Sequence, residues 1–451
     1  MRILLIAPRS DFPDVTPIWL RIAQMSLLIL EALSGSEHEV TVVEEEIEPI
    51  PYDQQWDVVG ITAMTATAPR SYELARRFRN LGAKVVLGGV HPSMLPEEGT
   101  RHADAVVVGE AEGIWPQVLE DARCDRLKSI YFNVAPEIQQ IPLVHYKNRR
   151  RLIPYPPRFN PVVASRGCPK SCEFCCVHKV YGRRFRRLPL DQVLEQVRLR
   201  PTRDVMFLDD NIASHRDWAA ELFNRLQPLK LRIISQIPVS FILDDELFAG
   251  AVKAGLKAVF VGIETIDEKA LARYSKSVTF EDYVEAIRRC RRARVIFHAA
   301  LIFGMDEHEC SIFERTLQFV MAQSIPSVSA YVLTPYPGTD LYDRLKREGR
   351  LLHRNWSYYD HLTPVFQPAR MTLRELTDGY MHFRQRLFGL GGILRRLPVQ
   401  IAVDPVAYLG LSMAFRSTTG LLEEHYRRYF RWLDNRSPLA DSSSGEGAWA
   451  L

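Results

Sequence analysis

Short apolar strands alternate with helical segments in two separate stretches of this 451-residue chain, and this alternation is what most constrains its fold. In the first stretch we predict strands at residues 2–7, 39–44, 57–62, 84–88 and 105–108, and helices at 18–33, 68–81 and 113–122. Continuous apolar strands separated by helices are typical of a parallel sheet covered on both faces. We therefore expect an α/β, doubly wound, Rossmann-like domain over residues 1–130.

The second stretch, residues 161–345, repeats the alternation with six strands. These strands are predicted at 161–165, 205–208, 232–236, 258–262, 296–302 and 328–333, and the following helices at 190–199, 217–226, 244–253, 280–293, 311–323 and 340–348. Six such units predict a partial (β/α)6 barrel of the TIM type. In barrels of this kind, functional residues gather at the carboxyl ends of the strands.

The remaining segments connect or follow these two stretches. Residues 131–160 are rich in proline and basic residues and are predicted to be a linker. Residues 346–435 are predicted to be mostly helical, with helices at 372–388 and 403–429 that are interrupted at 389–392 and at Pro398. Residues 436–451 have the composition of a disordered tail.

Three closely spaced cysteines directly follow the first strand of the second stretch. Cys168, Cys172 and Cys175 form the pattern C-x3-C-x2-C. Soft thiolates on one short loop suit an iron–sulfur cluster better than a hard cation. A cubane has four irons, so three cysteines would leave one iron open to another ligand. A zinc ribbon needs a second cysteine pair at ribbon distance, which the chain lacks.

Composition excludes several classes of protein. A net charge of +4 is too small to indicate nucleic-acid binding, and we interpret the basic run from Arg183 to Arg187 as a solvated face or an anion-holding loop. No uncharged apolar run approaches the ~18 residues of a membrane span. Seven cysteines, with three committed to one loop, favour a reducing compartment, and nothing else suggests secretion. We expect a cytoplasmic protein.

The cysteine loop, Ser165-Arg166-Gly167-Cys168-Pro169-Lys170-Ser171-Cys172-Glu173-Phe174-Cys175-Cys176, resembles the radical S-adenosylmethionine (SAM) superfamily. The resemblance implies that Cys168, Cys172 and Cys175 hold a [4Fe–4S] cluster. In that family the open iron binds the amino and carboxylate groups of SAM, and an electron from the cluster cleaves the sulfonium. A reductant such as flavodoxin or ferredoxin is therefore implied as a partner.

Other strand ends resemble the same family: Phe207-Leu208-Asp209-Asp210-Asn211, Val261-Gly262-Ile263-Glu264 and Ala300-Leu301-Ile302-Phe303-Gly304. The last departs from the family pattern because Ala300 replaces a glycine. The resemblance implies contacts to SAM from Phe174, Asp209, Asp210, Glu264, Ile302 and Gly304. Two alternatives stay open: Phe174 as a plain hydrophobic plug over the cluster, and one of the two aspartates as a helix N-cap.

Segments of the first stretch resemble the cobalamin-binding-type domain that is fused to many radical SAM proteins. They are Gly60-Ile61-Thr62-Ala63-Met64-Thr65, Leu87-Gly88-Gly89-Val90-His91-Pro92 and Val107-Val108-Gly109-Glu110. The implied cobalamin contacts are Thr62, Thr65, Gly88, Gly89, Gly109 and Glu110. The D-x-H-x-x-G loop is absent after the first strand, so either cobalamin binds without a histidine or the domain is vestigial. We interpret His91 as a turn residue.

The resemblance implies a cobalamin-dependent C-methyltransferase that acts on an unactivated carbon of a small molecule or lipid. One alternative is a cobalamin-independent radical SAM enzyme that forms another C–C or C–heteroatom bond. This includes aminocarboxypropyl transfer to a soft atom near Cys176, with Cys290 or Cys310 nearby. An iron–sulfur carrier or sensor is disfavoured because it would leave the barrel motifs without a purpose. Membrane contact through residues 389–414 is the less favoured interpretation of that apolar, arginine-bearing segment.

Overall fold

The structure is a computed structural model that describes residues 1–10, 24–134, 136–138, 141–144, 159–200, 202–273 and 278–435. Three sequence predictions lie outside this range in whole or in part: the start of the first helix, most of the linker and the C-terminal tail. No described helix combines the length and the apolar character needed to cross a membrane.

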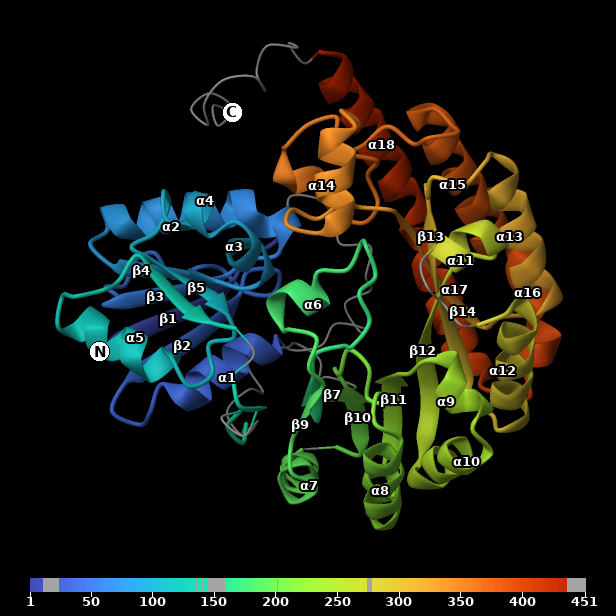
Figure 1. The fold of residues 1–451 in the computed structure, drawn as a ribbon, viewed down its shortest axis with the longest axis horizontal. Coiled ribbons are helices and arrows are strands. Elements are labelled where there is room, and N and C mark those ends of the chain that lie inside the picture. Colours follow the sequence, from blue (N-terminus) through green and yellow to red (C-terminus); the bar gives the residue numbers. More distant parts are fainter. Residues whose placement is uncertain are drawn as a thin grey trace.

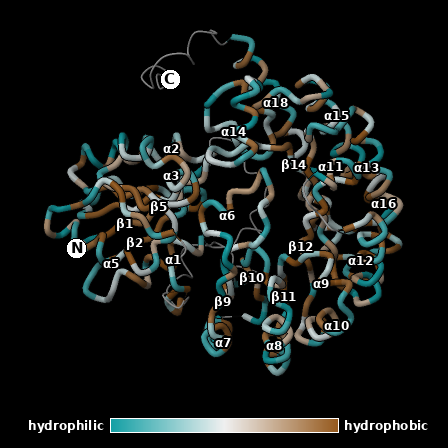
Figure 2. Tube along the Cα trace, in the orientation of Figure 1, coloured by the Kyte–Doolittle hydropathy of each residue, from teal (hydrophilic) through white to brown (hydrophobic). Residues whose placement is uncertain are grey.

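The N-terminal domain is a six-stranded parallel sheet in the order β2-β1-β3-β4-β5-β6. Its strands are β1 (Arg2–Ala7), β2 (Glu39–Glu44), β3 (Val58–Thr62), β4 (Lys84–Gly88), β5 (Ala105–Gly109) and β6 (Ile130–Asn133). The sequence analysis missed β6, which carries the sheet past residue 130. The strands are the most apolar part of the domain (Figure 2).

Helices cover both faces of this sheet, with α2, α3 and α4 on one side and α1 and α5 on the other (Figure 1). They are α1 (Met25–Leu33), α2 (Ala68–Asn80), α3 (Val90–Met94), α4 (Pro96–Gly99) and α5 (Trp115–Arg123). The doubly wound prediction is therefore confirmed. In a sheet of this order, ligands bind beyond the carboxyl ends of the strands, near the switch point between β1 and β3.

The second sheet has six parallel strands in chain order, β7-β10-β11-β12-β13-β14. They are β7 (Asn160–Val162), β10 (Asp204–Phe207), β11 (Arg232–Gln236), β12 (Leu256–Glu264), β13 (Ile296–Phe303) and β14 (Ser327–Val332). The connecting helices are α7 (Leu190–Arg198), α8 (Arg216–Leu226), α9 (Val239–Leu243), α10 (Asp245–Ala254), α11 (Glu268–Arg273), α12 (Phe280–Arg292), α13 (Ser311–Ala322) and α14 (Asp340–Arg347). The β7 and β14 edges do not pair with each other, which confirms a partial barrel.

The first predicted barrel strand is interrupted in the structure. Only β7 joins the barrel sheet, whereas β8 (Ser165–Arg166) pairs antiparallel with β9 (Arg186–Arg187). The chain between β8 and β9 contains the cysteine loop and the short helix α6 (Val177–Val180). In Figure 1 this segment lies between the two sheets.

Four helices complete the chain: α15 (Leu373–Phe388), α16 (Leu390–Gln400), α17 (Pro405–Ser417) and α18 (Thr419–Asp434). The predicted break at residues 389–392 is confined to Gly389, and α16 continues through Pro398. A Cβ on Gly392 would lie 2.3 Å from the carbonyl oxygen of Arg386. The glycine that looked like a helix breaker thus permits close packing of α16 on the end of α15.

Aromatic residues of the C-terminal region pack against the first domain. Trp356, Tyr358 and Tyr359 are buried in one hydrophobic cluster with β1, β3, β4 and α2. The indole Nε1 of Trp356 donates a hydrogen bond of 2.9 Å to Glu98 of α4. The C-terminal region therefore ties the N-terminal domain to the barrel.

Candidate active site

The cysteine loop lies at the carboxyl end of the first barrel strand. Gly167, with φ of +84°, starts the loop, and a Cβ there would lie 2.5 Å from the carbonyl oxygen of Arg184. Only glycine fits this close approach to β9. Cys168, Cys172 and Cys175 then line one cavity of about 480 Å³.

The thiols of this loop fit a multi-iron cluster. None of the three forms a disulfide, and each is half-buried. Within the described part of the chain, no three His, Cys, Asp or Glu side chains converge tightly enough to bind a single metal ion. The three thiols instead share the lining of the cavity of about 480 Å³. Burial raises the pKa of Cys175 to about 12, so this thiol is protonated at pH 7 unless a positive charge lies beside it.

Two carboxylates lie on the wall of the cysteine-lined cavity. Asp210, which follows β10, accepts a hydrogen bond of 3.3 Å from the backbone N–H of Gly167. Glu264 ends β12, where the register with β13 shifts and the residue takes a φ of +66°. A bulge of this kind redirects a side chain at the end of a strand. Both carboxylates are placed to accept hydrogen bonds from an ammonium or hydroxyl group in the cavity.

Asp209 points away from this cavity, in contrast to Asp210. Its carboxylate accepts hydrogen bonds from the hydroxyl of Ser165 and from the backbone N–H of Ala164. Burial raises the pKa of Asp209 to about 7. The N-cap of α8 is His215, whose ring accepts a hydrogen bond from Trp218 N–H, so neither aspartate caps this helix. Asp209 thus holds the strand that leads into the cysteine loop.

The remaining residues assigned to SAM contacts lie around Phe174. Phe174 lines the cavity and also packs on a small hydrophobic cluster, together with Ile302. Ile302 and Gly304 do not line the cavity among the described residues. Gly304, with φ of +95°, lies against Leu376. Both interpretations of Phe174, adenine contact and hydrophobic plug, are compatible with this position.

An ion-pair cluster that the sequence analysis missed holds the loop in place. Arg344 of α14 donates to Glu173 at 2.5 Å and forms an ion pair of 2.7 Å with Asp306. Arg350 forms a second ion pair with Asp306 at 2.6 Å. The carbonyl of Glu173 also accepts from Leu341 N–H at 3.0 Å. Glu173, which lies between Cys172 and Phe174, thereby links the cysteine loop after the first barrel strand to α14 after the last one.

A second, smaller cavity of about 110 Å³ lies at the carboxyl ends of β3, β4 and β5. Of the predicted cobalamin contacts, it is lined by Thr62, Gly88, Gly89, Gly109 and Glu110. The remaining one, Thr65, is buried in a short 3-10 helix (Thr65–Thr67) and does not line it.

This cavity has a backbone wall that suits close approach of a cofactor. Gly89 has a φ of +98°, and a Cβ there would lie 2.9 Å from the backbone of Ala63. The volume fits an elongated part of a corrinoid rather than a whole corrin ring. His91 does not face this space: it is fully buried in α3, with Nε2 3.4 Å from Glu98 and its ring edge-on to Trp356.

Buried ion pairs connect the two cavities. Arg166, two residues before Cys168, lines the second cavity and donates to Glu110 at 2.5 Å and to Glu112 at 2.6 Å. Arg186 of β9 also pairs with Glu110. This arginine belongs to the basic run that the sequence left as either a solvated face or an anion-holding loop. In the structure, it holds a carboxylate of the other domain.

The face of β12–β14 that turns toward the barrel interior carries aromatic side chains. Along these strands, Phe260, Ile302 and Tyr331 are accessible, whereas the residues beside them are buried against the helices. The carbonyl oxygen of His361 accepts a hydrogen bond of 2.7 Å from Val332 N–H at the end of β14, and a nitrogen of the solvent-accessible His361 ring lies 2.8 Å from the hydroxyl of Tyr336. Desolvation by neighbouring protein groups lowers the pKa of His361 to about 4, so the ring is neutral at pH 7.

A second histidine of this interior, His298 on β13, makes stability sensitive to acid. Its ring lies 2.8 Å from Ser327 and 2.9 Å from Ser329, and burial lowers its pKa to about 4. Below pH 6.5 the unfolded chain binds a proton that the folded chain does not. We expect the free energy of unfolding to fall between pH 6.5 and 4, by up to about 3 kcal/mol from this residue.

The variant His298→Gln removes this titration and keeps a polar side chain between the serines. Urea unfolding at several pH values should give a shallower loss of stability for His298→Gln than for the wild type. Parallel curves for the two proteins would show that His298 is not responsible.

The other cysteines do not form a common site. Cys176 is half-buried and precedes α6, Cys290 is fully buried in α12, and Cys310 is exposed before α13. Aminocarboxypropyl transfer to an atom held by these three sulfurs thus gains no support from their positions.

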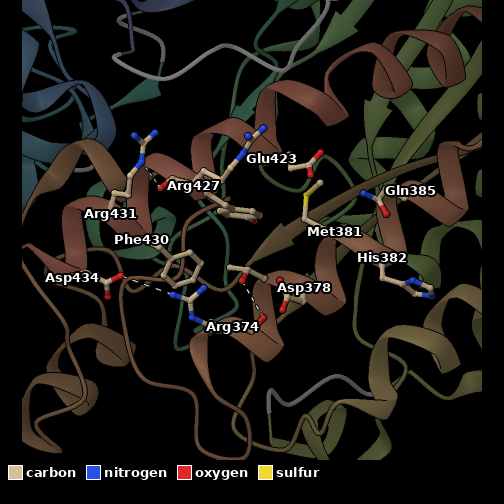
Figure 3. Close-up of a pocket in the computed structure, with 12 residues that line it drawn as sticks. Arg374, Asp378, Met381, His382, Gln385, Glu423, Arg427, Phe430, Arg431 and Asp434 are labelled. Carbon is tan, nitrogen blue, oxygen red and sulfur yellow. Dashed lines mark hydrogen bonds and ion pairs between the residues drawn. The ribbon is translucent and has the colours of Figure 1, made fainter.

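A third cavity, of about 530 Å³, lies between α15 and α18 (Figure 3). Its walls carry both signs of charge, and Arg374 and Asp434 approach to 3.9 Å across it. It contains none of the residues that the sequence singled out. We regard it as an outer groove of the helical region.

A partial parallel barrel with three cysteine thiols on one loop at its carboxyl end defines an iron–sulfur enzyme of the radical SAM type. Residues 162–320 match the model of the radical SAM superfamily and residues 14–119 that of the B12 binding domain. Residues 339–404 match a domain of unknown function (DUF4070).

Similar proteins support the same assignment. The chain is 30% identical to bacteriochlorophyllide d C-8(2)-methyltransferase of Chlorobaculum tepidum, over 77% of this chain and 81% of the relative. It is 26% identical to hopanoid C-2 methylase of Rhodopseudomonas palustris, over 82% and 75%. A solved structure of the radical SAM methyltransferase TsrM from Kitasatospora setae has the same fold, with a TM-score of 0.64 at 16% identity, over 90% and 89%.

The chain belongs to the radical SAM superfamily, in the group that carries an N-terminal B12 binding domain. The predictions of an enzyme and of its cofactors, a [4Fe–4S] cluster, SAM and cobalamin, are confirmed at this level. When bound, the cluster supplies the electron that cleaves SAM, and cobalamin can carry a methyl group.

Proposed function

We propose that this protein is a cobalamin-dependent radical SAM C-methyltransferase acting on an unactivated carbon of a large, apolar small molecule or lipid. The observation that carries the proposal is the position of Arg166. This residue lines the N-terminal cavity and lies two residues before Cys168, which lines the barrel cavity. The two cofactor sites are therefore joined through the Arg166 side chain and its ion pairs with Glu110 and Glu112.

The chain's own groups would bind and orient the reactants. Cys168, Cys172 and Cys175 would hold three irons, while Asp210 and Glu264 would accept hydrogen bonds from the ammonium and ribose of SAM. Phe174 would shield the cluster from water, because its ring lies between the cavity and a hydrophobic cluster. An external flavodoxin or ferredoxin would supply the electron.

The substrate class follows from the barrel interior and from the relatives. Phe260, Tyr331, Tyr336 and neutral His361 offer stacking surface and hydrogen bonds without charge. Curated relatives are named for methylation of a bacteriochlorophyllide and of a hopanoid, both large and rich in hydrocarbon. This aromatic surface suits either type.

The test is methyl transfer by anaerobically reconstituted protein that contains cluster and cobalamin. It would receive reductant, SAM with a trideuterated methyl group, and either bacteriochlorophyllide d or a hopanoid. The expected result is a product heavier by one labelled methyl group. Cleavage of SAM without any labelled product, from protein that retains cobalamin, would contradict transfer to these substrates.

A pair of glycine variants tests the role of cobalamin. In Gly89→Ala the new Cβ would meet the backbone of Ala63 at the cavity wall, so cobalamin retention and methylation should fall at least about tenfold. Gly82→Ala is the matched control, because Gly82 has a similar φ of +88° and open space around it. Methylation by Gly89→Ala after loss of cobalamin would favour the cobalamin-independent alternative.

A further inference from the structure

Two C-terminal helices direct large apolar side chains outward. On and just after α16, Leu390, Leu394 and Ile401 are 58%, 61% and 64% exposed, and on α17 Val406, Leu409 and Met413 are 78%, 39% and 51% exposed. These six residues are called the α16–α17 face below. The other exposed large apolar side chains of the described chain are scattered singly or in pairs.

The fold does not need this face, because the opposite sides of both helices already provide the packing. Arg396 of α16 is fully buried and donates to the carbonyls of Gly392, Ile325 and Leu387 at 2.8–3.1 Å. The hydroxyl of Tyr408 on α17 donates to Ile393 at 2.7 Å. With their inner sides fixed, the helices present a second apolar stripe to the outside. Contiguous exposed apolar surface on a protein marks a site of interaction.

The charges of the segment that carries this face are almost all positive. Between residues 385 and 422 the only acidic residue is Asp404. Its carboxylate caps α17 by accepting from Ala407 N–H at 2.9 Å. Arg386, Arg395 and Arg416 are exposed on the same segment. The combination is an apolar face with a cationic rim.

We propose that the α16–α17 face binds the surface of an anionic lipid bilayer, with the apolar side chains entering the interface and the arginines meeting phosphate groups. Helices that lie in the membrane plane have this pattern of apolar and basic residues. A two-fold contact with a second copy is disfavoured, because it would bring the arginines of one copy toward those of the other. This proposal does not depend on methyl transfer.

The experiment is co-sedimentation of the full chain, loaded with its cofactors, with vesicles of phosphatidylcholine alone or mixed with phosphatidylglycerol. We expect binding to the mixed vesicles that weakens with added salt, and weaker binding to phosphatidylcholine. The double variant Leu394→Glu/Val406→Glu should bind at least about tenfold more weakly. Arg395→Glu should weaken binding to mixed vesicles about fivefold and leave binding to phosphatidylcholine unchanged.

The controls separate lipid binding from unfolding and from self-association. Leu81→Glu changes a residue that is 55% exposed on the N-terminal domain, and it should bind vesicles like the wild type. Cofactor content and circular dichroism should be the same in all variants. Absence of vesicle binding, or equal loss in Leu81→Glu, would overturn the proposal. So would a dimer in sedimentation velocity that Leu394→Glu/Val406→Glu dissociates, with no vesicle binding.

Discussion

Cys172→Ala is expected to lose the four-iron cluster and with it reductive cleavage of SAM. Cys172 is one of three thiols around the barrel cavity, and removal of one iron ligand leaves too few to hold a cubane with a single open iron. Removing a group that only hydrogen-bonds to a metal ligand lowers metal affinity or activity about 10–100-fold. Removing a ligand itself should therefore reduce SAM cleavage by at least about a hundredfold. Iron and sulfide content, the visible spectrum and the yield of SAM cleavage products measure the effect.

Cys124→Ala is the matched control for this substitution. Cys124 is an exposed free thiol next to α5 in the N-terminal domain, far in sequence from the cysteine loop. It should retain full iron content and activity. Turnover by Cys172→Ala at more than about a tenth of the wild-type rate would contradict the assignment of Cys172 as an iron ligand.

Glu110→Gln is expected to weaken the junction between the two domains. The Glu110 carboxylate is buried and pairs with both Arg166 and Arg186. A neutral amide would leave these guanidinium groups with much less compensating charge, and breaking a buried pair costs about 3–5 kcal/mol. We expect that decrease in the free energy of unfolding, measured by urea denaturation of the whole chain, and a lower cobalamin content.

Glu120→Gln provides the comparison at the surface. Glu120 pairs with Arg123 at 2.7 Å on the exposed side of α5, so its loss should cost less than about 1 kcal/mol. If Glu110→Gln were no more destabilising than Glu120→Gln, the buried ion pairs could not be what holds the two domains together.

The strands and the cysteine loop were readily predicted, because both depend on local signals. Predicted strands 2–7, 39–44, 84–88 and 232–236 have the observed bounds, since continuous apolar runs flanked by turns leave little freedom. β6 was missed because its four residues alternate between buried and exposed at the edge of the sheet, without an apolar run. Gly389–Gly392 and Pro398 suggested a broken helix, but close packing on α15 favours the helix despite low propensity.

The site was predicted less completely than the fold. Asp209 and Asp210 are adjacent in sequence and equivalent in pattern, yet only Asp210 lines the cavity, because Asp209 turns toward Ser165 and Ala164 instead. The ion pairs of Glu173, Arg344 and Asp306 join residues far apart in the chain. The residues next to each of them in the sequence do not show whether its charged side chain forms an ion pair or lies in solvent. Such partners become visible only when the fold brings them together.

The central claim is that one iron, left without a protein ligand in the cavity of Cys168, Cys172 and Cys175, binds the methionine end of SAM. Electron–nuclear double resonance of the reduced, reconstituted protein with SAM labelled in its amino nitrogen and carboxylate oxygen tests this directly. The account predicts hyperfine coupling of both labels to the cluster. A spectrum that SAM leaves unchanged, from protein with four irons per chain, would contradict it.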